Sequence, residues 1–196
     1  MLRLAVLASG VGSIFEAMVK SGLPVELLVT DRPCRALEVA EENGVTSALV
    51  DRRDFGFAPR TQWDRKGFTK TVMAQLKSHD IGLIAMSGFM TVFDPVIYTK
   101  YQDRILNTHP SLLPAFKGEG GKVMRDTLAA GVTETGCTVH ISNAEIDDGR
   151  ILTQQRVPVL PDDTPDTLWE RIKAVERRLY PATIRKYSDE LSKKNA

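Results

Sequence analysis

Short apolar runs rich in β-branched residues alternate along this chain with longer segments whose apolar residues recur every three or four positions. These runs cover residues 2–7, 24–30, 47–50, 81–86 and 104–107. Runs that alternate with helical segments in this way are typical of a parallel sheet with crossover helices. The order of the segments therefore predicts an α/β fold with a mostly parallel sheet and flanking helices.

Helical patterns separate the apolar runs. They cover residues 14–21, 35–43, 65–79, 94–101, 123–130 and 164–187. Ser13 is a suitable N-cap for the first helix, because its hydroxyl can accept a hydrogen bond from the first turn. Pro181 lies inside the last pattern and predicts a kink or a division of that helix. The polar end of the chain, residues 188–196, is expected to fray.

The pattern changes in the last third of the chain. Two strand-like runs, residues 136–142 and 151–159, flank the dipeptide Asp148-Gly149, which is a strong signal for a hairpin turn. We therefore expect a late antiparallel hairpin beside the parallel strands. Because no linker or repeat interrupts the pattern, the 196 residues predict one domain, residues 1–196.

The composition excludes several classes of protein. The 26 basic and 25 acidic side chains nearly cancel, which argues against a broad nucleic-acid-binding surface. Two cysteines are too few for a disulfide framework, and three histidines without metal-ligand spacing predict no metal site. The apolar runs are too short to cross a bilayer and no targeting signal stands out. We therefore expect a soluble cytoplasmic protein that binds neither nucleic acid nor membranes.

A glycine-rich turn follows the first expected strand. Residues 9–13 read Ser-Gly-Val-Gly-Ser and lead into a helix, so backbone N–H groups and the helix dipole would converge on a bound phosphate. A tight turn without any ligand would have the same sequence. A dinucleotide site would also use an acid at the end of the second strand, here Asp31, but Phe15 stands where that motif has its third glycine. The turn alone leaves these interpretations open.

Asn107 and His109 are two positions apart in an expected strand, so their side chains would project from the same face. They would lie at the carboxyl edge of the sheet, where active sites of such folds are found. An amide beside an imidazole can stabilise an oxyanion, whereas a turn cap and a solvated histidine would give the same spacing. Asp147 can assist the imidazole, or it can simply belong to a good turn. His140 is expected to be a strand residue that faces a helix.

Five segments carry a resemblance to a known family: LASGVGS, SGFMTVFDP, LNTHPSLLPAFKG, TGCTVHISNAEIDDGRIL and ERIKAVERRLYP. In this order they resemble the folate-dependent formyltransferase family, in particular its members that act on glycinamide ribonucleotide. The resemblance implies a Rossmann-like formyltransferase fold. It also implies transfer of a formyl group from the co-substrate N10-formyltetrahydrofolate to the amine of glycinamide ribonucleotide in purine (IMP) biosynthesis. The implied substrates are small molecules, no metal is implied, and the protein would be a monomer or homodimer.

The same resemblance assigns site residues by position. The implied catalytic residues are Asn107, His109 and Asp147. The ribonucleotide and its phosphate would be bound by Val11, Gly12, Ser13, Ile14, Lys173 and Glu176. The folate cleft would be formed by Arg60, Met86, Met90, Thr91, Val92, Phe93, Asn107, Asn143, Ala144, Glu145 and Ile146. Asn107 and a protonated His109 would then hold the oxyanion formed when the amine attacks the formyl carbon, and Asp147 would keep the imidazole protonated.

The chain departs from the family pattern in two places. Family members usually have Asn where this chain has Val11 and Ile14, so a side-chain contact to the phosphate would be lost while the backbone N–H groups remain. After Gly118 the family continues with a His-containing helix start, whereas this chain reads Glu-Gly-Gly-Lys. We expect Gly120-Gly121 to form a mobile lid over the ribonucleotide and Lys122 to contact the phosphate.

Two alternative functions remain. One is another one-carbon enzyme: a formyltetrahydrofolate hydrolase, or a formylase of an amino sugar or an aminoacyl-tRNA. The hydrolase and the tRNA enzyme usually carry an extra domain, for which 196 residues leave no room. The other is a non-catalytic nucleotide-binding or phosphoribosyl-binding module, favoured by Gly10, Gly12 and Asp31. Such a module would have no need for Asn107, His109 and Asp147 together.

Overall fold

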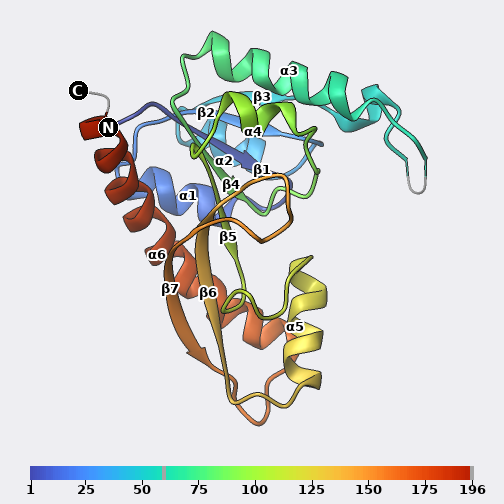
Figure 1. The fold of residues 1–196 in the computed structure, drawn as a ribbon, viewed down its shortest axis with the longest axis vertical. Coiled ribbons are helices and arrows are strands. Elements are labelled where there is room, and N and C mark those ends of the chain that lie inside the picture. Colours follow the sequence, from blue (N-terminus) through green and yellow to red (C-terminus); the bar gives the residue numbers. More distant parts are fainter. Residues whose placement is uncertain (59–60, 195–196) are drawn as a thin grey trace.

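A seven-stranded sheet forms the centre of the molecule, with the strand order β3-β2-β1-β4-β5-β6-β7 (Figure 1). The structure is a computed structural model that describes residues 1–58 and 61–194. Its strands are β1 (Leu4–Ala8), β2 (Val25–Thr30), β3 (Thr46–Leu49), β4 (Leu83–Ser87), β5 (Ile105–His109), β6 (Glu134–Ile141) and β7 (Ile151–Pro158). Strands β1 to β5 pair in parallel, and β6 pairs antiparallel with both β5 and β7. The predicted α/β fold, the mostly parallel sheet and the late antiparallel hairpin are confirmed.

Helices cover both faces of the sheet. They are α1 (Ser13–Lys20), α2 (Ala36–Glu42), α3 (Arg65–Ser78), α4 (Val96–Lys100), α5 (Gly120–Ala129) and α6 (Pro165–Lys194), with a short 3-10 helix η1 (Arg52–Phe55). None of the helices within the described part of the chain combines the length and the apolar composition that crossing a bilayer requires.

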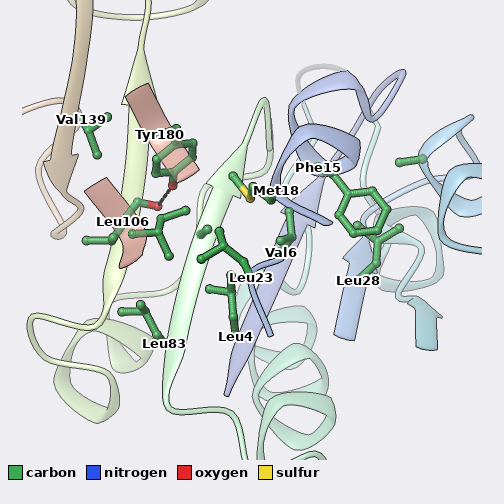
Figure 2. Packing of buried hydrophobic residues seen from close by; sticks show 14 of the residues in the cluster. Leu4, Val6, Phe15, Met18, Leu23, Leu28, Leu83, Leu106, Val139 and Tyr180 are labelled. Carbon is green, nitrogen blue, oxygen red and sulfur yellow. Dashed lines mark hydrogen bonds between the residues drawn. The ribbon is translucent and has the colours of Figure 1, made fainter. Parts of the chain in front are cut away.

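Alternate residues of each buried strand face opposite layers of the core. On one face, Leu4 and Val6 of β1 belong to a cluster with Phe15 and Met18 of α1 and Tyr180 of α6 (Figure 2). The Tyr180 hydroxyl donates a hydrogen bond of 2.9 Å to the carbonyl oxygen of Leu106, which ties α6 to β5. The second face packs against α3 and α4 through the buried residues Ala5, Leu7, Phe68, Val72, Leu76 and Ile97.

The last helix differs from the sequence prediction at one point. Pro181 lies inside α6, which continues as one helix from Pro165 to Lys194, so the predicted division there is wrong. Residues 188–194 belong to this helix, while residues 195–196 lie outside the described residues, and fraying at the end of the chain stays a prediction. Ser188 is buried and its hydroxyl accepts a hydrogen bond of 2.8 Å from the backbone N–H of Leu2. This part of the helix therefore packs against the start of the chain, and Figure 1 shows the last turns of α6 beside the N-terminus.

The turn between β1 and α1 needs a glycine at one position. Gly12 has a φ of +78° and is the N-cap residue of α1, so the predicted cap at Ser13 is wrong. A Cβ atom on Gly12 would lie 3.0 Å from the Cα of Ala36, the first residue of α2. The turn thus combines a left-handed backbone with close contact to a neighbouring helix, and both conditions favour glycine.

Candidate active site

Strands β5 and β6 place a group of polar side chains on one face of the sheet. Asn107 and His109 alternate with Thr108, so the first two share a face and Thr108 points to the other. Directly opposite Asn107 on the antiparallel β6 lies His140, and opposite His109 lies Thr138. Residues that pair directly across two strands project from the same face. The register therefore brings His140 beside the predicted pair.

Asp147 completes this group from the loop between β6 and β7. Its Oδ2 atom lies 3.4 Å from His109 Nδ1, and its Oδ1 atom lies 3.7 Å from His140 Nε2. The backbone N–H of Gly118 donates a hydrogen bond of 2.9 Å to Oδ2. Asp147 itself has a φ of +53°, a conformation that few residues other than glycine adopt. The structure thus brings Asn107 and His109, whose spacing predicted a shared face, together with Asp147, which the family resemblance had added to them.

His109 is buried and both of its ring nitrogens face acceptors. Nε2 donates a hydrogen bond of 2.8 Å to the carbonyl oxygen of Phe116, and Nδ1 faces the Asp147 carboxylate. A carbonyl and a carboxylate on opposite sides are the partners that an imidazole protonated on both nitrogens needs. The surroundings of His109 are therefore complementary to a cationic ring.

His140 is the site residue that the sequence interpretation missed. It was expected to face a helix, and that expectation is wrong, because its side chain lies among Asn107, Asp147 and the backbone of Ile141. Burial is the main cause that lowers the pKa of His140, and it outweighs the opposing effects of the Ile141 carbonyl and the Asp147 carboxylate. The lowered pKa favours the neutral form of the imidazole.

The loop after β5 joins the loop that carries Asp147. Lys117 forms an ion pair of 2.6 Å with Asp148, next to the bond between Gly118 and Asp147. Asp148-Gly149 does not form the tight hairpin turn that its sequence indicates, because residues 142–150 form a longer connection between β6 and β7. Two loops that are distant in sequence thus close over His109.

The expected glycine lid is instead the first turn of a helix. Gly120 and Gly121 begin α5, and a Cβ atom on Gly120 would lie 3.1 Å from the ring of Trp169 on α6. Helical hydrogen bonds and packing against an aromatic ring hold this segment, so the prediction of a mobile lid is wrong. Lys122 forms an ion pair with Asp126 one turn further along α5. Its contact with a phosphate stays a prediction.

The residues expected to bind the ribonucleotide lie in two places. Val11 is strongly exposed in the turn after β1, and Ser13 and Ile14 open the first turn of α1. On α6, Lys173 pairs with Glu170 at 2.7 Å and lies 4.8 Å from the centre of the Trp169 ring. The backbone of the turn is therefore accessible to an anion, as a phosphate site requires.

Glu176 is buried on the face of β5 that is opposite to Asn107 and His109. Only 4% of the residue is exposed, and its Oε1 atom accepts a hydrogen bond of 3.0 Å from the Thr108 hydroxyl. Burial raises the pKa of this carboxyl group to about 7, although the Thr108 hydroxyl and Lys173 act in the opposite direction. A contact between Glu176 and the ribonucleotide stays a prediction.

Residues 88–93 follow β4 and include four of the residues expected to bind the folate. Met90 and Val92 are 46% and 47% exposed, whereas Thr91 and Phe93 are 5% and 2% exposed. The side chains of Thr91 and Phe93 therefore point into the protein, and only their backbone groups remain for a ligand. Across the site, Asn143, Ala144, Glu145 and Ile146 are exposed in the loop before Asp147, whereas Met86 is buried in β4. Arg60 lies outside the described residues.

Asp31 does not have the free carboxylate that a dinucleotide site would need. The residue is 0% exposed, and its carboxylate accepts hydrogen bonds from the Thr91 hydroxyl and from Arg32 Nε. An acid that binds a ribose must present its oxygens to the ligand. This observation argues against the dinucleotide-binding alternative.

Among residues 1–58 and 61–194, no group of His, Cys, Asp and Glu side chains comes together in an arrangement that could hold a metal ion. The two histidines and the carboxylate of the cluster are instead held by hydrogen bonds to Asn107, Phe116 and Gly118. The arrangement supplies hydrogen-bond donors, a base and a ring that can carry charge, which are the groups used in acyl transfer.

The chain is similar to known proteins over most of its length. Residues 2–184 match the family described as formyl transferase. A phosphoribosylglycinamide formyltransferase from Mycobacterium tuberculosis is 41% identical over 187 residues, which cover 93% of this chain and 83% of the relative. One from Bacillus subtilis is 34% identical over 192 residues, which cover 94% of each protein. The crystal structure of glycinamide ribonucleotide transformylase 1 from Symbiobacterium toebii has a TM-score of 0.88 at 35% identity and covers 97% of this chain and 89% of that one. The chain belongs to the formyl transferase family.

Proposed function

We propose that this protein transfers the formyl group of N10-formyltetrahydrofolate to the amine of glycinamide ribonucleotide, a step of purine biosynthesis. The observation that carries the proposal is the cluster of Asn107, His109 and Asp147 at one edge of the sheet, within a chain similar to phosphoribosylglycinamide formyltransferases over nearly its whole length. Residues 1–196 would act as one domain in the cytoplasm, as a monomer or homodimer. The substrates would be small molecules, and no metal would take part.

The reaction is the attack of an amine on a formyl carbon. A bond forms between the amine nitrogen and the formyl carbon, and the formyl oxygen takes up negative charge in a tetrahedral intermediate. The bond to N10 of the folate then breaks, and N10 receives the proton that the amine loses. Donors aimed at the developing oxyanion supply the largest share of catalysis in such reactions.

Asn107 and His109 are suited to stabilise this oxyanion. The Asn107 amide has two N–H groups, of which one is directed to His140, so the other is free for a ligand. His109, held between the Phe116 carbonyl and Asp147, would act as a cation beside the developing charge. Both side chains are fixed before the substrate arrives, which is the condition for electrostatic stabilisation.

Asp147 is suited to handle the proton. Its carboxylate lies 3.4 Å from His109 Nδ1 and is anchored by the Gly118 N–H. It would balance the charge of the imidazole ring and accept the proton of the attacking amine, directly or through a water molecule. The hydrogen bond from Gly118 supports this role, because it holds the carboxylate beside the imidazole ring.

The two substrates would approach from opposite sides of this cluster. The exposed Met90 and Val92 offer an apolar wall for a planar heterocycle, with residues 143–146 on the other side. The turn at residues 11–14 offers backbone N–H groups at the start of α1 to the ribonucleotide phosphate. Val11 and Ile14 supply no polar side chain there, so the backbone would carry this interaction.

A spectrophotometric formyl-transfer assay with glycinamide ribonucleotide and N10-formyltetrahydrofolate tests the proposal. We expect turnover by the wild type and a loss of about 10²–10³-fold in kcat for His109→Ala, as for the loss of one oxyanion donor. For Asp147→Asn we expect a loss of about 10²–10⁴-fold, as for the loss of a general base. Asp148→Asn is a matched control, because Asp148 is exposed and forms its ion pair with Lys117 at the surface. Full activity of both His109→Ala and Asp147→Asn would refute the mechanism. Folate binding without turnover would indicate a different acceptor.

A further inference from the structure

Residues 88–93 follow the end of β4 and belong to no helix or strand. Met90 and Val92 point outward and Thr91 and Phe93 point inward, as in a strand. Within the described chain, no backbone–backbone hydrogen bond joins residues 89–93 to another segment. Side-chain interactions must therefore set the position of this segment, which we call the 88–93 segment.

Two hydrogen bonds attach the 88–93 segment to the ends of neighbouring strands. The backbone N–H of Met90 donates to the hydroxyl of Ser9, directly after β1, at 2.9 Å. The hydroxyl of Thr91 donates to Oδ2 of Asp31, directly after β2, at 2.5 Å. The segment is thus attached at the backbone of Met90 and at the side chain of Thr91, and we call these two hydrogen bonds the first and the second anchor.

The second anchor is part of a buried charged network. Asp31 is 0% exposed, and its carboxylate lies 3.4 Å from Arg32 Nε and 3.5 Å from Arg52 Nη1. Arg52 Nη1 also donates to the Thr91 hydroxyl at 3.3 Å, and the Arg52 guanidinium lies 4.1 Å from the centre of the Phe57 ring. The Thr91 hydroxyl therefore donates to Asp31 and accepts from Arg52, so both of its roles are in use.

A buried carboxylate makes this arrangement rigid. Removing one hydrogen-bond partner from a buried charge is costly, because the charge has no water to replace that partner. If the Thr91 side chain turned outward, the buried carboxylate of Asp31 would lose one of its hydrogen-bond partners. Buried and exposed side chains alternate along residues 90–93, so the inward direction of Thr91 goes together with the outward direction of Met90 and Val92.

We propose that Asp31 is a positioning residue for the folate wall, which it holds in place through the Thr91 hydroxyl. The proposal rests on the proposed function, since it takes the 88–93 segment to be the surface against which formyl-folate binds. Asp31 does not touch the folate, and the ribonucleotide turn at residues 11–14 does not depend on the Thr91 hydroxyl. Loss of the bond should therefore weaken folate binding and leave ribonucleotide binding intact.

Isothermal titration calorimetry with each substrate alone tests this separation. For Thr91→Val, which keeps the shape and removes the hydroxyl, we expect the Kd for N10-formyltetrahydrofolate to rise about tenfold and the Kd for glycinamide ribonucleotide to stay within about twofold. Thr91→Ser should restore most of the folate affinity. Thr99→Val makes the same chemical change at an exposed position of α4 and serves as the matched control.

Asp31→Asn provides a second variant if Thr91→Val fails to fold, since it keeps the shape of the side chain and removes its charge. It should show the same split between the two dissociation constants. Combined with Thr91→Val it should raise the folate Kd less than the product of the two single effects, because both changes break one bond.

Three outcomes would overturn the inference. An unchanged folate Kd in Thr91→Val and Asp31→Asn would refute this inference and leave the proposed function intact. An equal loss of affinity for both substrates would do the same, because a general structural role of Asp31 produces that result. A wild-type protein that does not bind formyl-folate would refute the proposed function, and this inference with it.

Discussion

Asn107 on β5 and His140 on β6 form a directly opposed pair, with the Asn107 amide nitrogen 3.3 Å from His140 Nε2. The other nitrogen of His140, Nδ1, lies 3.1 Å from the carbonyl oxygen of Ile141 and must carry the proton of the neutral ring. Nε2 is then an acceptor and takes one N–H of Asn107. His140 thereby sets the direction of the second N–H, the one that the proposed mechanism uses.

His140→Ala should therefore impair catalysis more than binding. We expect kcat for formyl transfer to fall about tenfold, because the freed amide can rotate away from the oxyanion, while the KM values stay within about twofold. Steady-state kinetics with both substrates measure this. His79→Ala, at the C-terminal end of α3 and away from the cluster, is the control. An unchanged kcat would show that Asn107 does not depend on His140.

Glu176→Gln should change how stability depends on pH. The carboxyl group ionises near 4.5 in the unfolded chain and near 7 in the folded protein, because burial raises its pKa. Between these pH values the folded protein holds a proton that the unfolded chain has lost, so the free energy of unfolding falls as the pH rises from about 4.5 to about 7. This loss amounts to about 3 kcal/mol. The Glu176→Gln variant has no carboxyl group at this position, so this loss does not occur in it. The variant should be more stable than the wild type at pH 8, and the difference should be much smaller at pH 5.

Urea denaturation at pH 5 and pH 8 measures the free energy of unfolding of the wild type and of the variant. Other titrating groups contribute equally to both proteins, so their contributions cancel in the difference. Glu190→Gln, an exposed change on the same helix, should shift the free energy of unfolding equally at both. A Glu176→Gln effect of the same size at pH 5 and pH 8 would contradict the prediction.

Gly12→Ala and Gly10→Ala should differ sharply in stability. Gly12 has a φ of +78° and its new Cβ would lie 3.0 Å from the Ala36 backbone, whereas no atom lies within 4 Å of a Cβ on Gly10. A left-handed backbone costs an alanine about 1–2 kcal/mol, and the close contact adds to that cost. Urea unfolding of both variants tests this. Equal midpoints would show that α2 moves aside without cost.

Gly121→Ala should stabilise the protein by up to about 1 kcal/mol, because alanine is a better helix former and this Cβ meets only ordinary contacts. Gly120→Ala should gain less or lose stability, since its Cβ would lie 3.1 Å from the Trp169 ring. Thermal unfolding compares the two variants. Destabilisation by Gly121→Ala would imply that this turn is not helical in solution.

Local patterns were sufficient to predict the strands, the helices and the shared face of Asn107 and His109, because a period of two residues is a property of the strand alone. The position of His140 depends on the register between β5 and β6, which the sequence of either strand does not contain. The approach of Asp147 depends on a left-handed residue within a long loop. Both are long-range features.

Tertiary packing also explains why α6 differs from what its sequence indicates. The hydrogen bond lost at Pro181 is offset by a helix that packs along the sheet, with Tyr180 bonded to Leu106 one residue earlier. The polar composition of residues 188–194 indicated fraying, but Ser188 is held by the backbone of Leu2. A partner at the other end of the chain leaves no signal in the local sequence.

Strand β5 serves both faces of the sheet at once. Asn107 and His109 lie on the face that carries the polar cluster, while the Thr108 hydroxyl donates a hydrogen bond to Glu176 on the opposite face. Insertion or deletion of a single residue within this strand would exchange the two faces, placing Asn107 and His109 in the core and the side chains of the opposite face at the candidate site. Any change in chain length near the site must therefore fall outside residues 105–109, in the loops that follow β5 and β6.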